Sequence, residues 1–291
     1  LVRSRGLGDV YKRQNLRTSG TKVIGLLIPD VRNCFYSEIT EYIRREVESY
    51  GFFLILGITG NSSNNEKKYI SEFISRKVDG VIWVPQLTYV NDIEHMKKLD
   101  EYGIPYLFLA AYYEQSSAPF VMCNLKKGSY LMTQYLIERD IHNIVMLIGD
   151  RRVDETYISG YKMALEEAGL VYSESNVYES TYHFDDVQKL AMEILKERPE
   201  AIMTNSDFTA CAVLQAARIK GLSIPRDLSV CGYDDVIYAT INQIPLTTVS
   251  QPIERMCKLA VNNLMNLLQY GIVPDSVILE PSLIIRDTVK R

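Results

Sequence analysis

The sequence of 291 residues lacks long apolar runs and carries no excess of positive charge. No run approaches the about 18 consecutive apolar residues of a transmembrane helix. We also expect no secretory signal, because the amino end has no apolar core segment. Lys and Arg number 32 against 36 Asp and Glu, which gives a formal net charge of −4. Phosphate contacts need clustered basic residues, so the main body of the protein is a poor candidate for binding nucleic acid.

Residues for metal, disulfide and nucleotide chemistry are also scarce. The 5 cysteines are odd in number and scattered, without a CxxC pair, and the 3 histidines are widely separated. The sequence has no phosphate-binding loop, no nucleophile elbow and no GxGxxG motif after a predicted strand. We therefore expect reduced cysteines, a cytoplasmic location, no catalytic residues, no metal and no cofactor.

Short apolar segments alternate with amphipathic ones from Lys22 onward. The apolar segments are rich in β-branched residues, and the series restarts near residue 126 with a helix, a strand at 143–149 and further helices. Strands that are apolar on both faces and separated by helices are typical of parallel sheets covered on both sides. The pattern predicts an α/β protein with two Rossmann-like lobes, whose parallel sheets are joined by a hinge of several chain crossings.

The segment 224–252, IPRDLSVCGYDDVIYATINQIPLTTVSQP, is the most informative in the chain. A short apolar strand at 228–231 is followed by a turn with two adjacent carboxylates, Asp234 and Asp235. Open α/β folds bind ligands at the carboxyl ends of their strands. An ionised carboxylate there could accept hydrogen bonds from neighbouring hydroxyls of a sugar. The alternative is that one of these aspartates caps the helix that follows.

Five further residues belong to the predicted effector-binding set, and several have a simpler explanation as well. Phe35 and Tyr36 could stack on a ring-shaped ligand, or pack as the first turn of a helix. Arg151 follows the strand at 143–149, and Gln86 follows a strand predicted at 79–85. Asp207 begins a helix, where the role of N-cap is the better explanation.

The order of several longer blocks resembles one known family. From about residue 16 to 288 the chain is similar to the effector-binding core of the LacI/GalR transcription regulators. The matching blocks are LRTSGTKVIGLLIPDVRNCFYSEI, VDGVIWVP, GYKMALEEAG, IPRDLSVCGYDD, IPLTTVSQP and LIIRDT. The resemblance implies a fold of the type I periplasmic-binding-protein kind, two lobes with a cleft between them, and a regulator that is not an enzyme.

The resemblance also implies a domain division and partners. Members of the family begin with a helix-turn-helix domain, and we expect contact with operator DNA only through such a domain, which we expect to be missing here. A homodimer, a small-molecule effector that is a sugar or similar polar metabolite, and no membrane partner are expected. The predicted divisions are a non-native or disordered tail at 1–14, a remnant of the hinge connector at 15–21, a first lobe of 22–119 plus 248–274, and a second lobe of 120–247 plus 275–291.

Some site residues follow from this resemblance, and others depart from it. Asp234 corresponds to the aspartate that grips effector in the family, Phe35 and Tyr36 to an aromatic pair of the cleft, and Arg151 to an arginine that contacts effector in some members. Tyr157 stands where many members carry an effector-binding Arg, so the five N–H donors of a guanidinium are absent at this position. Two alternatives stay open, a periplasmic sugar-binding protein of a transporter and an α/β enzyme that uses Asp234 and Asp235.

Overall fold

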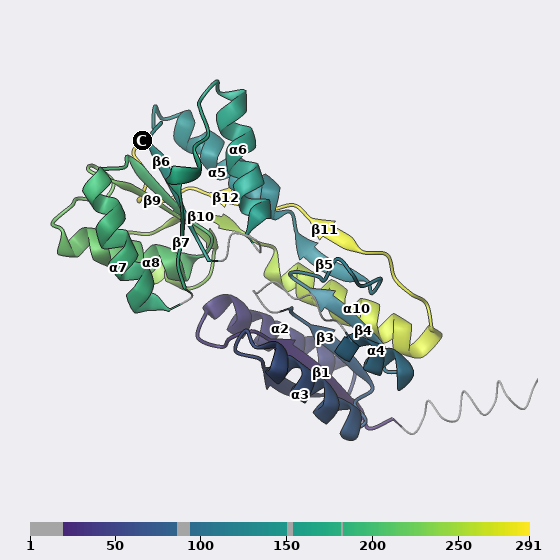
Figure 1. Cartoon of the computed structure of the whole chain (residues 1–291). Helices are drawn as coiled ribbons and strands as arrows, with labels where there is room; N and C mark the ends of the chain where they lie inside the picture. The colour runs from purple at the N-terminus through teal and green to yellow at the C-terminus, as the bar shows by residue number, and fades with distance from the viewer. Residues whose placement is uncertain (1–19, 86–93, 150–153, 182) are drawn as a thin grey trace, which may run out of the picture.

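Two six-stranded sheets, each covered by helices on both faces, form the two lobes of the molecule (Figure 1). The computed structural model describes residues 20–85, 94–149, 154–181 and 183–291. The first lobe lies in the lower half of Figure 1, and the second lobe, with the C-terminus, lies at its upper left. Among the described residues, no helix is long and apolar enough to cross a membrane.

Both sheets have the strand order of doubly wound α/β folds, in which the first strand of the lobe lies between the second and the third. In the first lobe the order is β11 (Val277–Leu279), β5 (Phe120–Cys123), β4 (Tyr106–Leu109), β3 (Gly80–Trp83), β1 (Val23–Ile28) and β2 (Phe53–Ile58), and every pairing is parallel. In the second lobe it is β12 (Ser282–Ile284), β10 (Thr247–Ser250), β9 (Ser229–Asp234), β8 (Ala201–Thr204), β6 (Ile144–Ile148) and β7 (Val177–Glu179). Only the β10–β12 pairing is antiparallel in this second sheet.

Apolar helix faces cover both sides of each sheet, which explains why the central strands are apolar throughout. In the first lobe, α2 (Cys34–Ser49) and α10 (Ile253–Tyr270) pack on one face, and α3 (Ser63–Ser75) and α4 (Glu94–Glu101) on the other. In the second lobe, α5 (Leu125–Ile137) and α6 (Glu155–Glu167) share one face, and α7 (Phe184–Ile194) and α8 (Asp207–Ile219) the other. The predicted architecture of two Rossmann-like lobes is therefore confirmed.

Within the described residues the chain crosses between the lobes at three places. It passes from β5 to α5, from β10 to α10 and from β11 to β12. The sheet pairing corrects the predicted boundaries at these crossings. Residues 120–123 and 277–279 were assigned to the second lobe but pair in the first sheet, whereas 248–250 were assigned to the first lobe but pair in the second. Hydrogen-bonding partners decide the lobe of a strand, and a periodic sequence pattern does not reveal them.

Local capping explains where several helices begin. The side chains of Asn33, Ser62, Asn124 and Ser206 each accept a hydrogen bond from a backbone N–H in the first turn of α2, α3, α5 and α8. Such caps satisfy donors that the helix itself leaves free. The cap of α8 is thus Ser206, and the predicted N-cap role of Asp207 is wrong. The strands β5, β7 and β12 were not predicted. The short helix α9 (Tyr238–Ile241) follows the two aspartates, but neither of them caps it.

Candidate functional site

A cleft of about 120 Å³ lies between the lobes at the carboxyl ends of the central strands. The segments after β1, β3 and β4 supply the wall from the first lobe, and those after β8, β9 and β10 supply much of the wall from the second. In open α/β sheets this is where ligands bind, because the loops after the strands can vary without disturbing the sheet.

Aromatic and small side chains form the wall of the first lobe. Phe35 and Tyr36 are buried at the start of α2, with ring centroids 5.2 Å apart in an edge-to-face arrangement. Their backbone is fixed because the Asn33 side chain accepts from the Phe35 N–H at 3.0 Å. Ala110 and Ala111 line the same wall and leave room beside the rings. The wall can therefore accept the apolar face of a small ring.

Tyr157 and two polar residues form much of the opposite wall. The Tyr157 ring packs edge-on against Tyr233, with centroids 4.9 Å apart, and burial raises its pKa well above the ordinary value. Asp154 is buried beside it and accepts hydrogen bonds from the Gly149 N–H at 2.9 Å and from the Asn205 amide at 2.8 Å. These bonds hold the Asp154 carboxylate in place at the edge of the cleft.

Asp234 and Gln251 form the polar floor of the cleft. Asp234 is 5% exposed, and its Oδ1 accepts a hydrogen bond from Gln251 Nε2 at 2.8 Å. Burial raises the pKa of Asp234 well above its usual value, and the nearby Asp207 carboxylate raises that pKa further. Gln251 is 7% exposed, and its buried Oε1 has no hydrogen-bond partner. An unpaired buried acceptor costs about 1–3 kcal/mol, so a ligand with an N–H or O–H donor would bind here favourably.

The backbone at Asp234 is held in a conformation that few residues adopt. Asp234 has φ 107° and Asp235 has φ 60°, both in the region that favours glycine. Strain of this kind costs about 1–3 kcal/mol for each residue and is concentrated at functional sites. In this backbone conformation the two neighbouring carboxylates point in different directions. Asp235 pairs with Arg286 at 2.6 Å, whereas Asp234 faces the cleft. An acid/base pair acting across one bond is not formed.

The structure brings four of the seven predicted effector-binding residues together. Phe35, Tyr36, Tyr157 and Asp234 all line the cleft. Asp207 is fully buried beneath it and is not among the lining residues. The predictions for Gln86 and Arg151 lie outside the described residues.

Sequence reasoning missed Gln251, Asp154 and Asn205 as cleft residues. The signal was present, because each of them follows closely after a strand of the second sheet. Polar residues at the carboxyl ends of β6, β8 and β10 should have been considered together with Asp234. In the part of the chain that the structure describes, no group of three or more His, Cys, Asp or Glu side chains could hold a metal ion.

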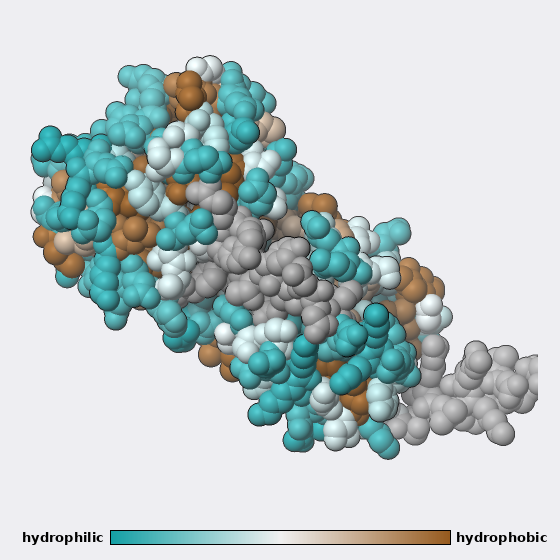
Figure 2. All heavy atoms as spheres, in the orientation of Figure 1, coloured by the Kyte–Doolittle hydropathy of each residue, from teal (hydrophilic) through white to brown (hydrophobic). Residues whose placement is uncertain are grey.

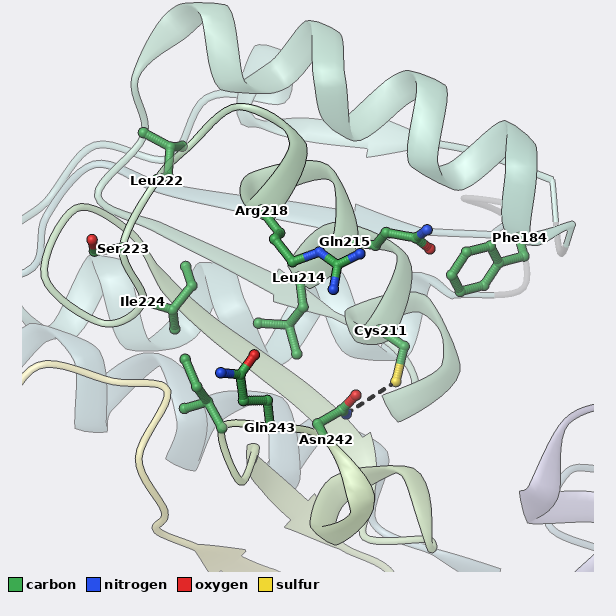
Figure 3. Close-up of a pocket in the computed structure, with 11 residues that line it drawn as sticks. Phe184, Cys211, Leu214, Gln215, Arg218, Leu222, Ser223, Ile224, Asn242 and Gln243 are labelled. Atoms are coloured by element: carbon green, nitrogen blue, oxygen red, sulfur yellow. Dashed lines mark hydrogen bonds between the residues drawn. The ribbon is translucent and has the colours of Figure 1, made fainter.

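A second, larger pocket of about 540 Å³ lies on the outer surface of the second lobe (Figure 3). Side chains of α8, such as Leu214 and Arg218, face Asn242 and Gln243 of the segment after α9 across this pocket. Asn242 also donates from its amide to the Cys211 sulfur at 3.2 Å. The pocket shares no lining residue with the cleft.

Two lobes with three crossings and a polar cleft between them define a ligand-binding protein of the periplasmic-binding-protein type. Comparison with known proteins agrees, because the profile of the family described as periplasmic binding protein-like domain matches residues 133–289, more than half of the chain. The transcriptional repressor PurR of Vibrio atlanticus is 32% identical over 285 residues, 95% of this chain and 84% of that protein. The transcriptional regulator DegA of Bacillus subtilis is 31% identical over 239 residues, 81% of this chain and 71% of that protein.

The fold comparison gives the same result. A LacI family transcriptional regulator from Enterococcus faecium, solved with bound ribose, superposes with a TM-score of 0.84 at 21% identity, covering 92% of this chain and 98% of that chain. The chain belongs to the LacI/GalR family of transcriptional regulators.

Proposed function

We propose that this chain senses a small, polar, single-ring metabolite in the cleft between its lobes and controls DNA binding accordingly. The observation that carries the proposal is the Asp234–Gln251 pair, a buried carboxyl beside an unpaired amide oxygen, opposite the aromatic wall of Phe35 and Tyr36. This arrangement suits a ring with hydroxyl or N–H groups on its edge and an apolar face.

The size of the cleft supports a ligand with one ring. A dry protein cavity of about 150 Å³ holds a benzene ring, and the volume here is about 120 Å³. The regulator from Enterococcus faecium holds ribose, a sugar with a single ring. We therefore place monosaccharides first among the candidate effectors, followed by other small polar ring compounds.

Effector binding would act through the arrangement of the lobes. A ligand that contacts both walls stabilises the arrangement in which they are close, and it can shift the equilibrium only by its difference in affinity for the two states. Couplings of this kind are about 1–3 kcal/mol, which changes operator affinity about five- to 150-fold. Operator contact would be made by a helix-turn-helix unit, and the protein would act in the cytoplasm without catalysing a reaction.

We propose that the regulator is a two-fold symmetric homodimer, because a helix-turn-helix regulator reads two operator half-sites at a fixed spacing. Two exposed apolar surfaces support this. Phe53, Leu56 and Ile58 are 72%, 36% and 37% exposed on β2, an edge strand of the first sheet. On the second lobe, Ile241 is 63% exposed at the end of α9, next in the chain to the pocket residue Asn242, and Figure 2 shows hydrophobic side chains on the α7 and α8 side.

The homodimer can be tested by sedimentation of variants with one charged substitution. Phe53→Asp should weaken self-association by at least about 30-fold, since truncating a central interface residue costs about 2 kcal/mol or more. The matched control is Val171→Asp, because Val171 is 89% exposed but belongs to neither surface. Dissociation constants equal for Phe53→Asp, Val171→Asp and the unchanged protein would contradict the proposed interface.

The effector proposal is tested first by a thermal-shift screen. The purified chain is mixed with monosaccharides, sugar phosphates, nucleosides and purines, each well above its expected dissociation constant. A true effector at 100 times its dissociation constant should stabilise the protein by about 2.7 kcal/mol, which is a readily visible shift. A cooperatively folded protein whose melting temperature none of these compounds changes would count against a small polar effector.

A further inference from the structure

The turn 234–238 belongs to the second lobe but makes contacts with the first. Val236 is buried in the apolar cluster that α2 and α10 build on the first sheet. The Tyr238 hydroxyl donates to the backbone carbonyl of Arg32 at 3.5 Å. Burial raises the pKa of the Glu38 carboxyl on α2, and a hydrogen bond from the Ile237 backbone N–H opposes that rise. The turn that begins at a cleft residue therefore also forms a contact between the lobes.

The Asp207 carboxylate holds this turn from inside the second lobe. Its Oδ2 accepts the Val236 N–H at 2.9 Å, and its Oδ1 accepts the Thr248 hydroxyl at 2.5 Å. The turn needs such support because Asp234 and Asp235 both have positive φ. The approach is close, since a Cβ on Gly232 would lie 2.2 Å from Asp207 Oδ1. The carboxylate thus ties β9, β10 and the turn together at one point.

Few groups around Asp207 compensate its charge. The pKa of Asp207 is about 7, raised mainly by burial and also by the charge of Asp235. The hydrogen bonds from Thr248 and Val236 and the charge of Arg286 oppose this rise. Cys211 and Asp234 also interact with it electrostatically, and Asp207 raises the pKa of both. Opening of the turn would return the Asp207 carboxyl to water.

We infer that Asp207 is a positioning residue, which couples the cleft to the contact between the lobes by holding the turn 234–238 in its strained conformation. It touches neither the cleft nor the first lobe, and acts through Val236 and Thr248. Its consequence for effector binding rests on the proposed function, whereas the holding of the turn can be measured without any ligand.

The coupling has a defined dependence on pH. When the turn is closed, the pKa of Asp207 is about 7, and when it opens to water the pKa returns toward 3.8. Between these values the closed form binds one more proton than the open form, so opening becomes easier as pH rises. The opening constant should increase up to about tenfold per pH unit between about pH 4 and pH 7, and level off above pH 7.

Amide hydrogen exchange of the full chain tests this directly. Exchange at residues 235–238 is followed at pH 5 and pH 7 and corrected for the intrinsic rate at each pH. In the unchanged protein the opening constant should rise up to about hundredfold between these values. In Asp207→Asn the turn should stay protected, because the amide can accept the Val236 N–H and donate to Thr248. The rise of the opening constant with pH should become smaller, because Asp234 is then the remaining buried carboxyl of the turn whose pKa is raised.

Two further measurements separate this role from general stability. Asp207→Ala should lose protection in the turn at both pH values, while β1 in the other lobe keeps the exchange of the unchanged protein. Thr248→Val, which removes one of the two contacts, should weaken protection and keep the pH dependence. An Asp207→Asn protein with the wild-type pH dependence would overturn the inference, whatever the effector screen finds. If the alanine variant does not fold, the asparagine variant alone decides.

Discussion

Replacing Asp207 by asparagine should make the protein more stable at pH 8 although it alters a fully buried hydrogen-bonded residue. Burial raises the pKa of this carboxyl from 3.8 to about 7 in the folded protein. Three pKa units correspond to about 4 kcal/mol. The protonated Asp207 carboxyl contributes this amount to the free energy of unfolding below about pH 4. The contribution is lost as pH rises through 7, because the ionised group must then stay buried.

The asparagine variant does not suffer this loss, since an amide has no charge to bury. The free energy of unfolding at pH 8 should therefore increase by about 3–4 kcal/mol. This figure already subtracts about 1 kcal/mol for the weaker hydrogen bonds of the amide. A melting temperature higher by roughly 10 °C follows for a protein of this size. Near pH 4 the variant should be equal to the unchanged protein or slightly less stable.

The assay is thermal unfolding by circular dichroism at several pH values between 4 and 8, taken as variant minus unchanged protein. The difference curve cancels the titration of the groups that do not interact with Asp207. Asp227→Asn is the matched control, because the side-chain hydrogen bond from Arg226 lowers the pKa of Asp227 to about 2, opposite to Asp207. A difference curve for Asp207→Asn that stays flat or falls with rising pH would refute the reasoning.

Two other substitutions test the packing of the lobes. Gly160→Ala should lower the free energy of unfolding by about 1–3 kcal/mol, because its Cβ would lie 2.1 Å from the Lys126 backbone oxygen where α5 and α6 meet. Denaturant unfolding measures this, and wild-type stability would show that the two helices can move apart without cost. Glu66→Leu should cost about 2–6 kcal/mol, because it removes the buried carboxylate that accepts from the Trp83 indole N–H and the Tyr113 hydroxyl, and the loss of each such bond costs about 1–3 kcal/mol. Glu66→Gln keeps an acceptor and should cost clearly less, and equal losses in the two variants would contradict that account.

Much of the fold could be predicted from the sequence, because long helices and apolar strands have strong periodic signals. The pattern predicts a helix at 252–270 and a strand at 23–29, and the structure has them at 253–270 and 23–28. Short strands such as β7, with only 3 residues, give no such signal. Strand partners are decided by pairing across the sheet, which is why β5 and β11 were assigned to the other lobe.

The site was predicted in part, and the errors have a physical cause. Position after a strand indicated that Asp234 would lie at the cleft, and the family resemblance indicated the same for Tyr157. Both residues line it. It could not indicate side-chain direction, so Asp207 was expected in the cleft although its carboxylate points beneath it toward Thr248. Gln251 was missed because its role depends on Asp234, from which it is separated by 17 positions in the chain.

The most direct test of the central claim is a calorimetric titration of the compound found by the screen into three proteins. These are the unchanged chain, Asp234→Ala, and Asp235→Asn as the control, because Asp235 faces Arg286 and not the cleft between the lobes. Loss of a buried hydrogen-bond partner costs about 1–3 kcal/mol, so Asp234→Ala should weaken binding about five- to 150-fold while Asp235→Asn leaves it nearly unchanged. Equal affinity for all three folded proteins would show that the effector does not bind in this cleft, and the account would be contradicted.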